Sequence, residues 1–116
     1  MSQKKQAVRN TFRISVFQRD RYECVICGKK TLSIETSEET LDSHHITPRE
    51  EMTNGGYVKE NGITLCKGND GTSCHEKAEA YLKGESHDVA YAPGTLYRLI
   101  QSTREIADRA SKSLCE

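Results

Sequence analysis

The sequence predicts an α+β fold, in which two short antiparallel strands and a helix lie beside a zinc site and further helices flank both ends. Two observations lead to this prediction. Short apolar segments of strand type alternate with segments of helical periodicity along the chain. Four of the five cysteines form two spaced pairs, while only 34% of the 116 residues are apolar and none is tryptophan. A core this thin is typical of domains stabilised by a metal or by disulfides.

The length predicts one domain, residues 1–116. The first ten residues, MSQKKQAVRN, are polar, so no signal peptide is expected. No run approaches the roughly 18 apolar residues of a membrane span, which argues against a membrane partner. In a chain of this kind, spaced cysteines more often bind metal than form disulfides. We therefore expect a reducing, cytoplasmic location.

The N-terminal half is expected to contain one helix, a cysteine turn and one strand. Residues 1–10 resemble a frayed basic arm, and the stretch TFRISVFQRD, with Phe and Val at helical spacing, predicts a short helix. The next stretch, ECVICGKK, brings two cysteines and a glycine into a tight turn. Residues 31–40 are rich in Ser, Thr and Glu and predict a loop or a weak hairpin. Residues 41–46 predict a strand that ends before Pro48.

The C-terminal half is expected to contain the second strand and two helices. GITLC at 62–66 is a short apolar segment of strand type, and antiparallel pairing is expected because nothing between the strands suggests a crossover. Ser73 and Glu76 have the spacing of a capping box, and Gly84 is suited to end the helix that follows. Apolar residues at helical spacing predict one further amphipathic helix over residues 95–114.

The cysteine spacing predicts one structural Zn²⁺. Cys24 and Cys27 form a CxxC pair before a glycine, and Cys66 and Cys74 form a second pair. Two thiolates on a tight turn can converge on a tetrahedral zinc ion, and two such pairs complete a site. The second gap is longer than usual, but glycines in the intervening KGNDGTS allow the chain to loop out and return. For the CxxC pair alone, a redox motif is the alternative.

The formal net charge of zero hides an asymmetry along the chain. Residues 1–30 carry eight basic and two acidic groups, whereas residues 31–62 carry two basic and seven acidic groups. A basic surface of this kind is typical of nucleic-acid binding, although a solvated basic face is equally consistent with it. The candidate phosphate contacts are the following basic residues: Arg13, Arg19, Arg21, Lys29, Lys30 and Arg49.

Three histidines and an asparagine accompany the cysteines. His44 and His45 are adjacent at a strand end, where neighbouring side chains point to opposite faces. Asn61 directly precedes the second strand, and His75 follows Cys74 at the start of the capped helix. Taken singly, each is consistent with an ordinary loop or turn residue. Together, bracketed by the cysteine pairs, they resemble the HNH endonucleases.

Four stretches carry this resemblance, in the order RDRYECVICG (19–28), LDSHHITPRE (41–50), NGITLC (61–66) and CHEKAEAYL (74–82). The resemblance covers about residues 10–84, and residues 85–116 lie outside it as a helical extension that covers the core or a second copy of the chain. It implies a ββα-metal core, in which two strands and a helix bind one divalent cation that serves in the cleavage of DNA. A separate zinc ion bound by four cysteines often accompanies this core. The resemblance leaves the choice between monomer and homodimer open.

The resemblance also implies roles for single residues. His44 and His75 match ligands of the catalytic cation, His45 matches the general base, and Asn61 matches the residue that fixes the loop and helps to orient the base. Many relatives carry Asp at the position of His44, so the preferred ion is open among Mg²⁺, Mn²⁺, Ni²⁺ and Zn²⁺. A neutral imidazole is well suited to accept a proton from water near neutral pH.

Two other functions remain open at this level. A catalytically inactive zinc-containing module could bind nucleic acid through the same scaffold, although it would have no need to keep both His45 and His75. A purely structural zinc protein leaves the histidine pair unexplained. Nucleases of the resembling type occur in restriction systems, mobile introns, and phage genome processing and packaging, and the sequence does not discriminate among these roles.

Overall fold

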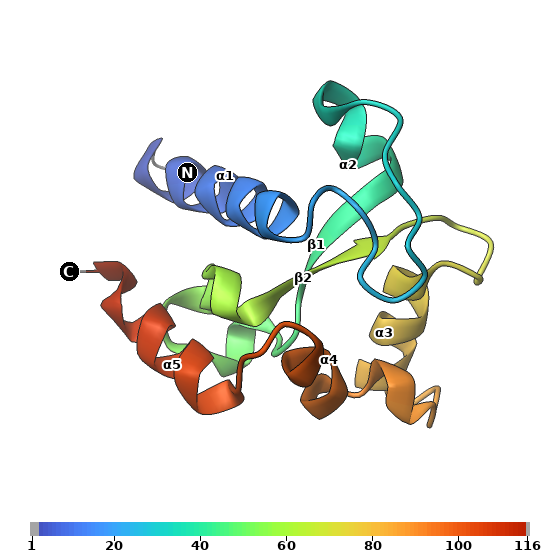
Figure 1. Cartoon of the computed structure of the whole chain (residues 1–116). Coiled ribbons are helices and arrows are strands. Elements are labelled where there is room, and N and C mark those ends of the chain that lie inside the picture. The colour runs from blue at the N-terminus through green and yellow to red at the C-terminus, as the bar shows by residue number, and fades with distance from the viewer. Residues whose placement is uncertain (1–2, 116) are drawn as a thin grey trace.

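A two-stranded antiparallel sheet lies at the centre of the molecule, with helices on both of its faces (Figure 1). This arrangement comes from a computed structural model that describes residues 3–115. β1 (Leu41–His45) pairs with β2 (Gly62–Cys66), and His45 lies opposite Gly62 in the register. The predicted α+β class and the antiparallel pairing are confirmed.

α1 (Gln3–Arg19) covers one face of the sheet and α3 (Cys74–Leu82) covers the other (Figure 1). An aromatic ring of α1 packs against the ring of His45, whereas an imidazole of α3 packs against the ring of His44. Because neighbouring residues of a strand point to opposite faces, the two helices lie on opposite sides of β1. The most completely buried apolar side chains of the chain include Val16, Leu41, Ile46, Ile63, Leu65 and Leu96.

α1 is longer than the sequence predicted, because the expected basic arm is helical from Gln3 onward. Lys, Gln, Ala and Arg, which make up most of this segment, are among the better helix formers. The helix ends where Arg21 and Tyr22 adopt left-handed φ values of 59° and 56°. The Tyr22 N–H then donates to the carbonyl of Phe17 at 2.9 Å, which closes the last turn before the first cysteine pair.

Residues 31–40 form neither the loop nor the hairpin that the sequence predicted. A 3₁₀ turn (Ile34–Thr36) leads into α2 (Ser37–Thr40), which runs directly into β1. Hydroxyl groups close these turns locally, as the Ser37 Oγ donates to the carbonyl of Ile34 at 2.9 Å. Ser and Thr side chains compete for backbone groups in this way, which favours short turns over strand pairing.

α3 begins and ends as predicted. The Ser73 hydroxyl accepts a hydrogen bond from the Glu76 N–H while the Glu76 carboxylate accepts from the Ser73 N–H, which is the predicted capping box. Gly84 follows the helix with a left-handed φ of 76°, a conformation that a residue without a Cβ adopts at little cost. The helix that carries Cys74 and His75 is therefore fixed at both ends by its own sequence.

The predicted single helix over residues 95–114 is wrong, because the structure has two helices, α4 (Pro93–Leu99) and α5 (Arg104–Lys112). The chain turns between them where Gln101 adopts a left-handed φ of 58°. Thr103 then caps α5 by accepting a hydrogen bond from a backbone N–H of its first turn at 3.1 Å. Thr before a helical segment is a start signal that the regular apolar spacing obscured.

The extension that contains α4 and α5 is part of the core. Leu96 and Ala107 are buried, whereas Leu99 of the predicted apolar stripe is 47% exposed. Ser111 is also fully buried. Its hydroxyl donates to the carbonyl of Thr53 and accepts from the N–H of Gly56, so α5 holds the turns that connect the two strands.

Truncation after Gly84 is therefore expected to destabilise the chain strongly. It would remove four side chains of the apolar core, Tyr91, Leu96, Tyr97 and Ala107. Full burial of one large apolar side chain contributes about 1.5–3 kcal/mol, and a typical domain is stable by only about 5–15 kcal/mol. Thermal unfolding should show a much lower midpoint, and sedimentation should show whether association changes. An unchanged midpoint together with unchanged sedimentation would contradict this expectation.

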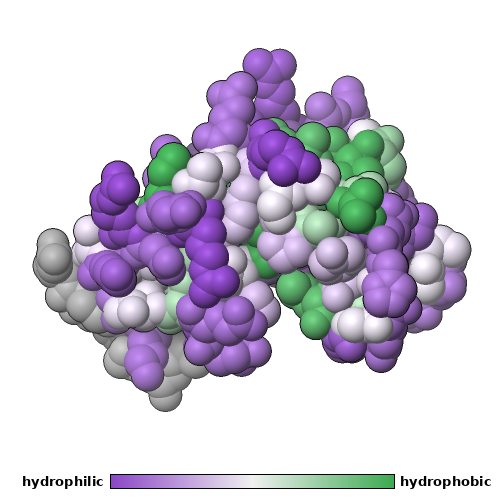
Figure 2. Space-filling model, turned by 90° about the horizontal axis from the view of Figure 1, so that it is seen from below, coloured by the Kyte–Doolittle hydropathy of each residue, from purple (hydrophilic) through white to green (hydrophobic). Residues whose placement is uncertain are grey.

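The face seen in Figure 2 is mostly hydrophilic, and its apolar side chains gather in small separate patches. Six large apolar side chains are exposed among the described residues: Ile14, Leu32, Ile34, Val89, Leu99 and Ile106. They come from separate segments rather than from one continuous stripe of a helix. Over residues 3–115, no helix is long and apolar enough to cross a membrane.

Candidate metal centres and catalytic site

The four predicted zinc ligands come together where three elements meet. Cys24 and Cys27 lie on the turn after α1. Cys66 is the last residue of β2, and Cys74 is the first residue of α3. The four Sγ atoms all lie within 4.8 Å of one another. All four residues are free cysteines, and their sulfur atoms are close enough together to hold one metal ion.

Backbone hydrogen bonds shape the first cysteine turn. The Gly28 N–H donates to the carbonyl of Cys24, and the Cys24 N–H donates to the carbonyl of Lys29, both at 2.9 Å. Gly28 has a left-handed φ of 80°, which the tight turn requires and glycine adopts readily. The Sγ atom of Cys27 is thereby brought to 3.6 Å from that of Cys66 on β2.

The long gap in the second pair is accommodated by a loop that folds back on α3. The N–H of Gly71, which has a left-handed φ of 86°, donates to the carboxylate of Glu76 at 2.8 Å. Cys74 then returns to the cluster, where its N–H donates to the Sγ of Cys66 at 3.3 Å. The same glutamate that caps α3 thus anchors the loop, and the unusual spacing does not displace the helix from the strands.

This donor set fits a zinc ion. Four sulfur ligands around one point are typical of structural tetrahedral zinc. Burial, together with the neighbouring Cys24, raises the pKa of the Cys74 thiol well above its ordinary value. A bound divalent cation offsets that cost, because it stabilises the thiolate form of its ligands. The Tyr91 hydroxyl, which donates towards the Cys74 Sγ at 3.8 Å, also suits a negatively charged sulfur.

A second cluster of metal-binding side chains lies where β1 meets α3. His44 comes from β1, whereas His75 and Glu79 lie one helical turn apart on α3. One ligand atom from each lies within 4.8 Å of the others. Glu79 Oε1 is 3.2 Å from His75 Nε2 and 3.6 Å from His44 Nδ1. The structure thus brings the two predicted ligands of the catalytic cation together and adds a carboxylate.

Glu79 is absent from the ligands predicted from the sequence, although a local signal exists. It follows His75 by four residues and therefore shares its face of the helix. Its interaction with the His44 imidazole, aided by the charges of both histidines, lowers the pKa of Glu79 to about 2. A second carboxylate, Asp42 of β1, has its Oδ2 atom 3.2 Å from His75 Nε2. Asp42 therefore lies beside His75, but outside the group of three side chains whose ligand atoms all lie within 4.8 Å of one another.

These side chains fit a divalent cation. His44 is only 3% exposed, and its Nε2 atom has no hydrogen-bond partner among residues 3–115. A buried nitrogen without a partner is costly, and a cation held by the Nε2 atom would remove that cost. The side chains of His75 and Glu79 are 26% and 43% exposed, so the cluster is accessible from the α3 side.

His45 points to the face of β1 opposite His44, as the sequence predicted. Its ring lies between those of Phe12 and Tyr57, with centroids 4.6 Å from each. Burial, with the charges of His44 and Arg49 adding to it, lowers the pKa of His45 to about 4. The imidazole is therefore neutral near pH 7 and retains a nitrogen that can accept a proton. Its buried Nε2 has no hydrogen-bond partner within the described part of the chain.

Asn61 holds the segment that follows His45. Its side chain is fully buried, and its Oδ1 accepts from the Thr47 N–H at 3.0 Å. Its Nδ2 donates to the carbonyls of Thr47 at 3.1 Å and Gly56 at 3.2 Å. Its own carbonyl accepts from the Ile46 N–H at 2.8 Å. Asn61 therefore continues the pairing of the two strands beyond His45.

Comparison with protein families gives one match, in which residues 24–80 fit the family model described as HNH endonuclease. This part of the chain is similar to the HNH endonuclease family. Comparisons with curated proteins and with solved structures gave no match. The matched HNH region spans both cysteine pairs, both strands and most of α3, whereas α1, α4 and α5 lie outside it.

Basic side chains of α1 reach the His45 side of the HNH region. His45 lines a hollow of about 280 Å³ together with Arg9, Arg13 and Lys67. Arg9 lies over the ring of Tyr57, 5.4 Å from its centroid. Of these three basic residues, the sequence predicted only Arg13 as a phosphate contact. The packing of α1 on β1, which the charge pattern does not encode, brings Arg9 to this place, and Lys67 comes from the residue directly after β2.

The other predicted phosphate contacts lie in different settings. Arg49 donates to the Tyr57 hydroxyl at 3.1 Å and therefore lies near His45. The guanidinium group of Arg19 is engaged in hydrogen bonds within the protein. It donates to the Asp20 carboxylate and to two backbone carbonyls near the start of β2. Three more lie on or beside the first cysteine turn: Arg21, Lys29 and Lys30.

Proposed function

We propose that this chain is a metal-dependent endonuclease that hydrolyses phosphodiester bonds in DNA. One observation carries the proposal: the neutral, largely buried His45 directly follows His44, which joins His75 and Glu79 on the opposite face of β1. A proton acceptor and one cation ligand are thereby neighbours on β1, and the two further ligands come from α3. Phosphodiester hydrolysis needs both functions close together, so the arrangement suits this chemistry better than nucleic-acid binding alone.

The ligands of the catalytic cation in this proposal are His44, His75 and Glu79. When bound, such a cation polarises the phosphate and stabilises negative charge on the leaving oxygen. Two imidazole nitrogens favour Mn²⁺, Ni²⁺ or Zn²⁺ over Mg²⁺, which prefers oxygen ligands. The four-cysteine cluster holds a separate structural Zn²⁺ and has no part in the reaction.

His45 is the general base in this proposal. Its neutral imidazole accepts a proton from the attacking water, and a positioned base typically accelerates such a step by about 10²- to 10⁴-fold. Asn61 fixes the backbone just beyond His45, which limits the movement of the base. The phosphodiester backbone of DNA lies in the hollow that Arg9 and Arg13 line with His45. Arg49, beside Tyr57, adds positive charge at the same place.

Incubation of the purified chain with supercoiled plasmid and single divalent cations tests the proposal. Nicked or linear plasmid is expected with Mn²⁺, Ni²⁺ or Zn²⁺, and intact plasmid is expected after chelation of the catalytic cation. Plasmid that stays intact with every cation, in the presence of folded protein, would exclude the nuclease function. If such a protein still binds DNA, the inactive zinc-containing binding module takes its place.

We further propose that the whole chain acts as one nuclease domain in a reducing, cytoplasmic compartment. The placement of four cysteines around one point supports this setting, because spaced cysteines that bind metal are more typical of reducing compartments than of oxidising ones. The contribution of α4 and α5 to the core supports one domain, since residues outside the HNH region complete it.

Neutralisation of basic residues near His45 is expected to weaken DNA binding for all sequences alike. A variant that combines Arg13→Gln and Arg49→Gln should lower the slope of log binding constant against log salt by about 0.9 for each DNA phosphate that the protein no longer neutralises. Fluorescence anisotropy at several salt concentrations measures this slope. A second variant neutralises the candidates beside the cysteine turn: Arg21, Lys29 and Lys30.

The matched control neutralises Arg109 and Lys112, which lie in the last turn of α5, outside the HNH region and outside the hollow around His45. It removes the same number of charges as the first variant and should leave the slope close to that of the wild type. Arg19 is left unchanged in every variant, because its hydrogen bonds hold α1 to β2. An equal change of slope in the control would mean that the basic residues act only through net charge.

A further inference from the structure

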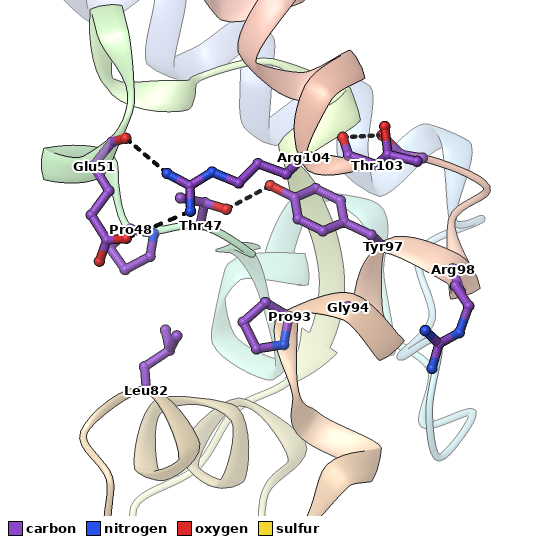
Figure 3. A pocket seen from close by; sticks show the side chains of 11 residues that line it. Thr47, Pro48, Glu51, Leu82, Pro93, Gly94, Tyr97, Arg98, Thr103 and Arg104 are labelled. Carbon is purple, nitrogen blue, oxygen red and sulfur yellow. Dashed lines mark hydrogen bonds and ion pairs between the residues drawn. The ribbon is translucent and has the colours of Figure 1, made fainter.

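A tyrosine from outside the HNH region contacts the asparagine of the candidate site. Tyr97 lies on α4 and is only 4% exposed. Its hydroxyl donates to Asn61 Oδ1 at 2.7 Å and lies 2.7 Å from the Thr47 hydroxyl oxygen. Figure 3 shows Tyr97 and Thr47 joined in this way at the wall of a cavity of about 410 Å³. α4 therefore reaches the segment that directly follows His45.

The direction of these hydrogen bonds follows from the number of protons available. A tyrosine hydroxyl has one proton to donate, and that of Tyr97 is directed at Asn61 Oδ1. The Thr47 hydroxyl must therefore donate to the Tyr97 oxygen. Burial raises the pKa of Tyr97, so its hydroxyl stays protonated near neutral pH. The result is a chain of two hydrogen bonds that runs from Thr47 through Tyr97 to Asn61.

This network leaves the Asn61 amide with one orientation. Its Oδ1 accepts from the Thr47 N–H and the Tyr97 hydroxyl, and its Nδ2 donates to the carbonyls of Thr47 and Gly56. All four hydrogen-bonding positions of the amide are thus used. In a buried site such a fully satisfied network is rigid, and the loss of one member leaves another without its partner.

One end of the network lies on the segment that carries His45, and the other lies on the segment that pairs with it. Thr47 is two residues beyond His45 along the chain. Asn61 directly precedes Gly62, which is the partner of His45 in the sheet. A shift of Thr47 or Asn61 would therefore be transmitted to His45 from its own strand and from the paired strand.

We propose that Tyr97 is a positioning residue of the nuclease site: its hydroxyl fixes Asn61 and Thr47 and thereby holds the His45 imidazole in the orientation that accepts a proton. This inference rests on the proposed endonuclease function. Tyr97 acts through the segment that follows His45 and through the segment paired with it, rather than by contact with DNA. The extension beyond the HNH region is then part of the active site as well as part of the core.

Tyr97→Phe tests this inference, because it keeps the buried ring and removes only the hydroxyl. The kcat for plasmid cleavage is expected to fall roughly 10- to 100-fold, since small displacements of a catalytic group have effects of this size. The KM for DNA and the affinity for the catalytic cation should stay at wild-type values. Amide hydrogen exchange should become faster at Thr47, whose N–H donates to Asn61, while the amides of β2 keep their rates.

Ser102→Ala is the matched control. Ser102 is also buried in the extension, and its hydroxyl donates to the carbonyl of Glu60 at 2.8 Å rather than to the Asn61 side chain. This variant loses a similar hydrogen bond between the same two parts of the chain, and its kcat should equal that of the wild type. A wild-type kcat in Tyr97→Phe, or an equal loss of kcat in Ser102→Ala, would overturn the positioning role.

The wild-type protein separates the two possible failures. If it cleaves plasmid and Tyr97→Phe cleaves equally fast, the positioning role is wrong and the endonuclease function stands. If the wild type cleaves no plasmid with any cation, the endonuclease function is wrong and the positioning role fails with it. Slower cleavage by Tyr97→Phe, together with faster exchange at Thr47 and unchanged metal binding, supports both.

Discussion

Removal of the zinc ion proposed for the four-cysteine cluster is expected to unfold the chain. The cluster joins the turn after α1, the end of β2 and the start of α3, so these segments would lose their common anchor together. Binding of a structural zinc contributes about 10–16 kcal/mol of apparent free energy. The total stability of a typical domain is about 5–15 kcal/mol. A sequence with 34% apolar residues has little further core to offset such a loss.

Elemental analysis of protein expressed without added metal should find about one zinc per chain. Titration with a strong chelator should abolish the helical circular dichroism signal as zinc is removed, and added Zn²⁺, but not Mg²⁺, should restore it. Cys27→Ser, which changes the one exposed ligand of the cluster, should lower both the zinc content and the unfolding midpoint. A protein that stays folded after complete zinc removal, or disulfides among the four cysteines, would contradict the assignment.

Local sequence patterns predicted the elements on which both candidate centres rest. The capping box of Ser73 and Glu76 predicted the start of α3, and alternation along a strand predicted opposite directions for His44 and His45. These features depend on residues a few positions apart, whose geometry is set by the period of a helix or strand. Glu79 was not predicted, although it belongs to the same class, because its helical spacing from His75 is a local signal.

Contacts between distant segments could not be predicted in this way. Tyr97 reaches Asn61 across 36 residues, and Arg19 reaches the carbonyl of Gly62 across 43 residues. Such pairs depend on how helices pack against the sheet, which no local period encodes. The break between α4 and α5 is a further case. It depends on the left-handed conformation of Gln101, and glutamine has no marked preference for that conformation.

His45→Ala is expected to abolish cleavage while binding of DNA and of the catalytic cation persists. A missing general base typically reduces the rate by about two to four orders of magnitude. The cation ligands His44, His75 and Glu79 lie on the other face of β1, so they remain in place. Because His45 is packed between two aromatic rings, the alanine variant also leaves a cavity. His45→Gln, which fills much of that space and cannot act as a base, should lose cleavage equally.

Loss of a cation ligand should have a different signature. His44→Ala, His75→Ala and Glu79→Gln should weaken cation binding as well as cleavage. Each variant removes one ligand of the cation, and loss of the bound cation removes the Lewis acid that the reaction needs. Calorimetric titration with Mn²⁺ and plasmid cleavage, carried out side by side on all variants, distinguish the two classes. If His45→Ala lost cation binding while His44→Ala kept it, the two histidines would exchange roles. If every variant cut plasmid at the wild-type rate, the reaction could not take place at this site, and the nuclease function would fail.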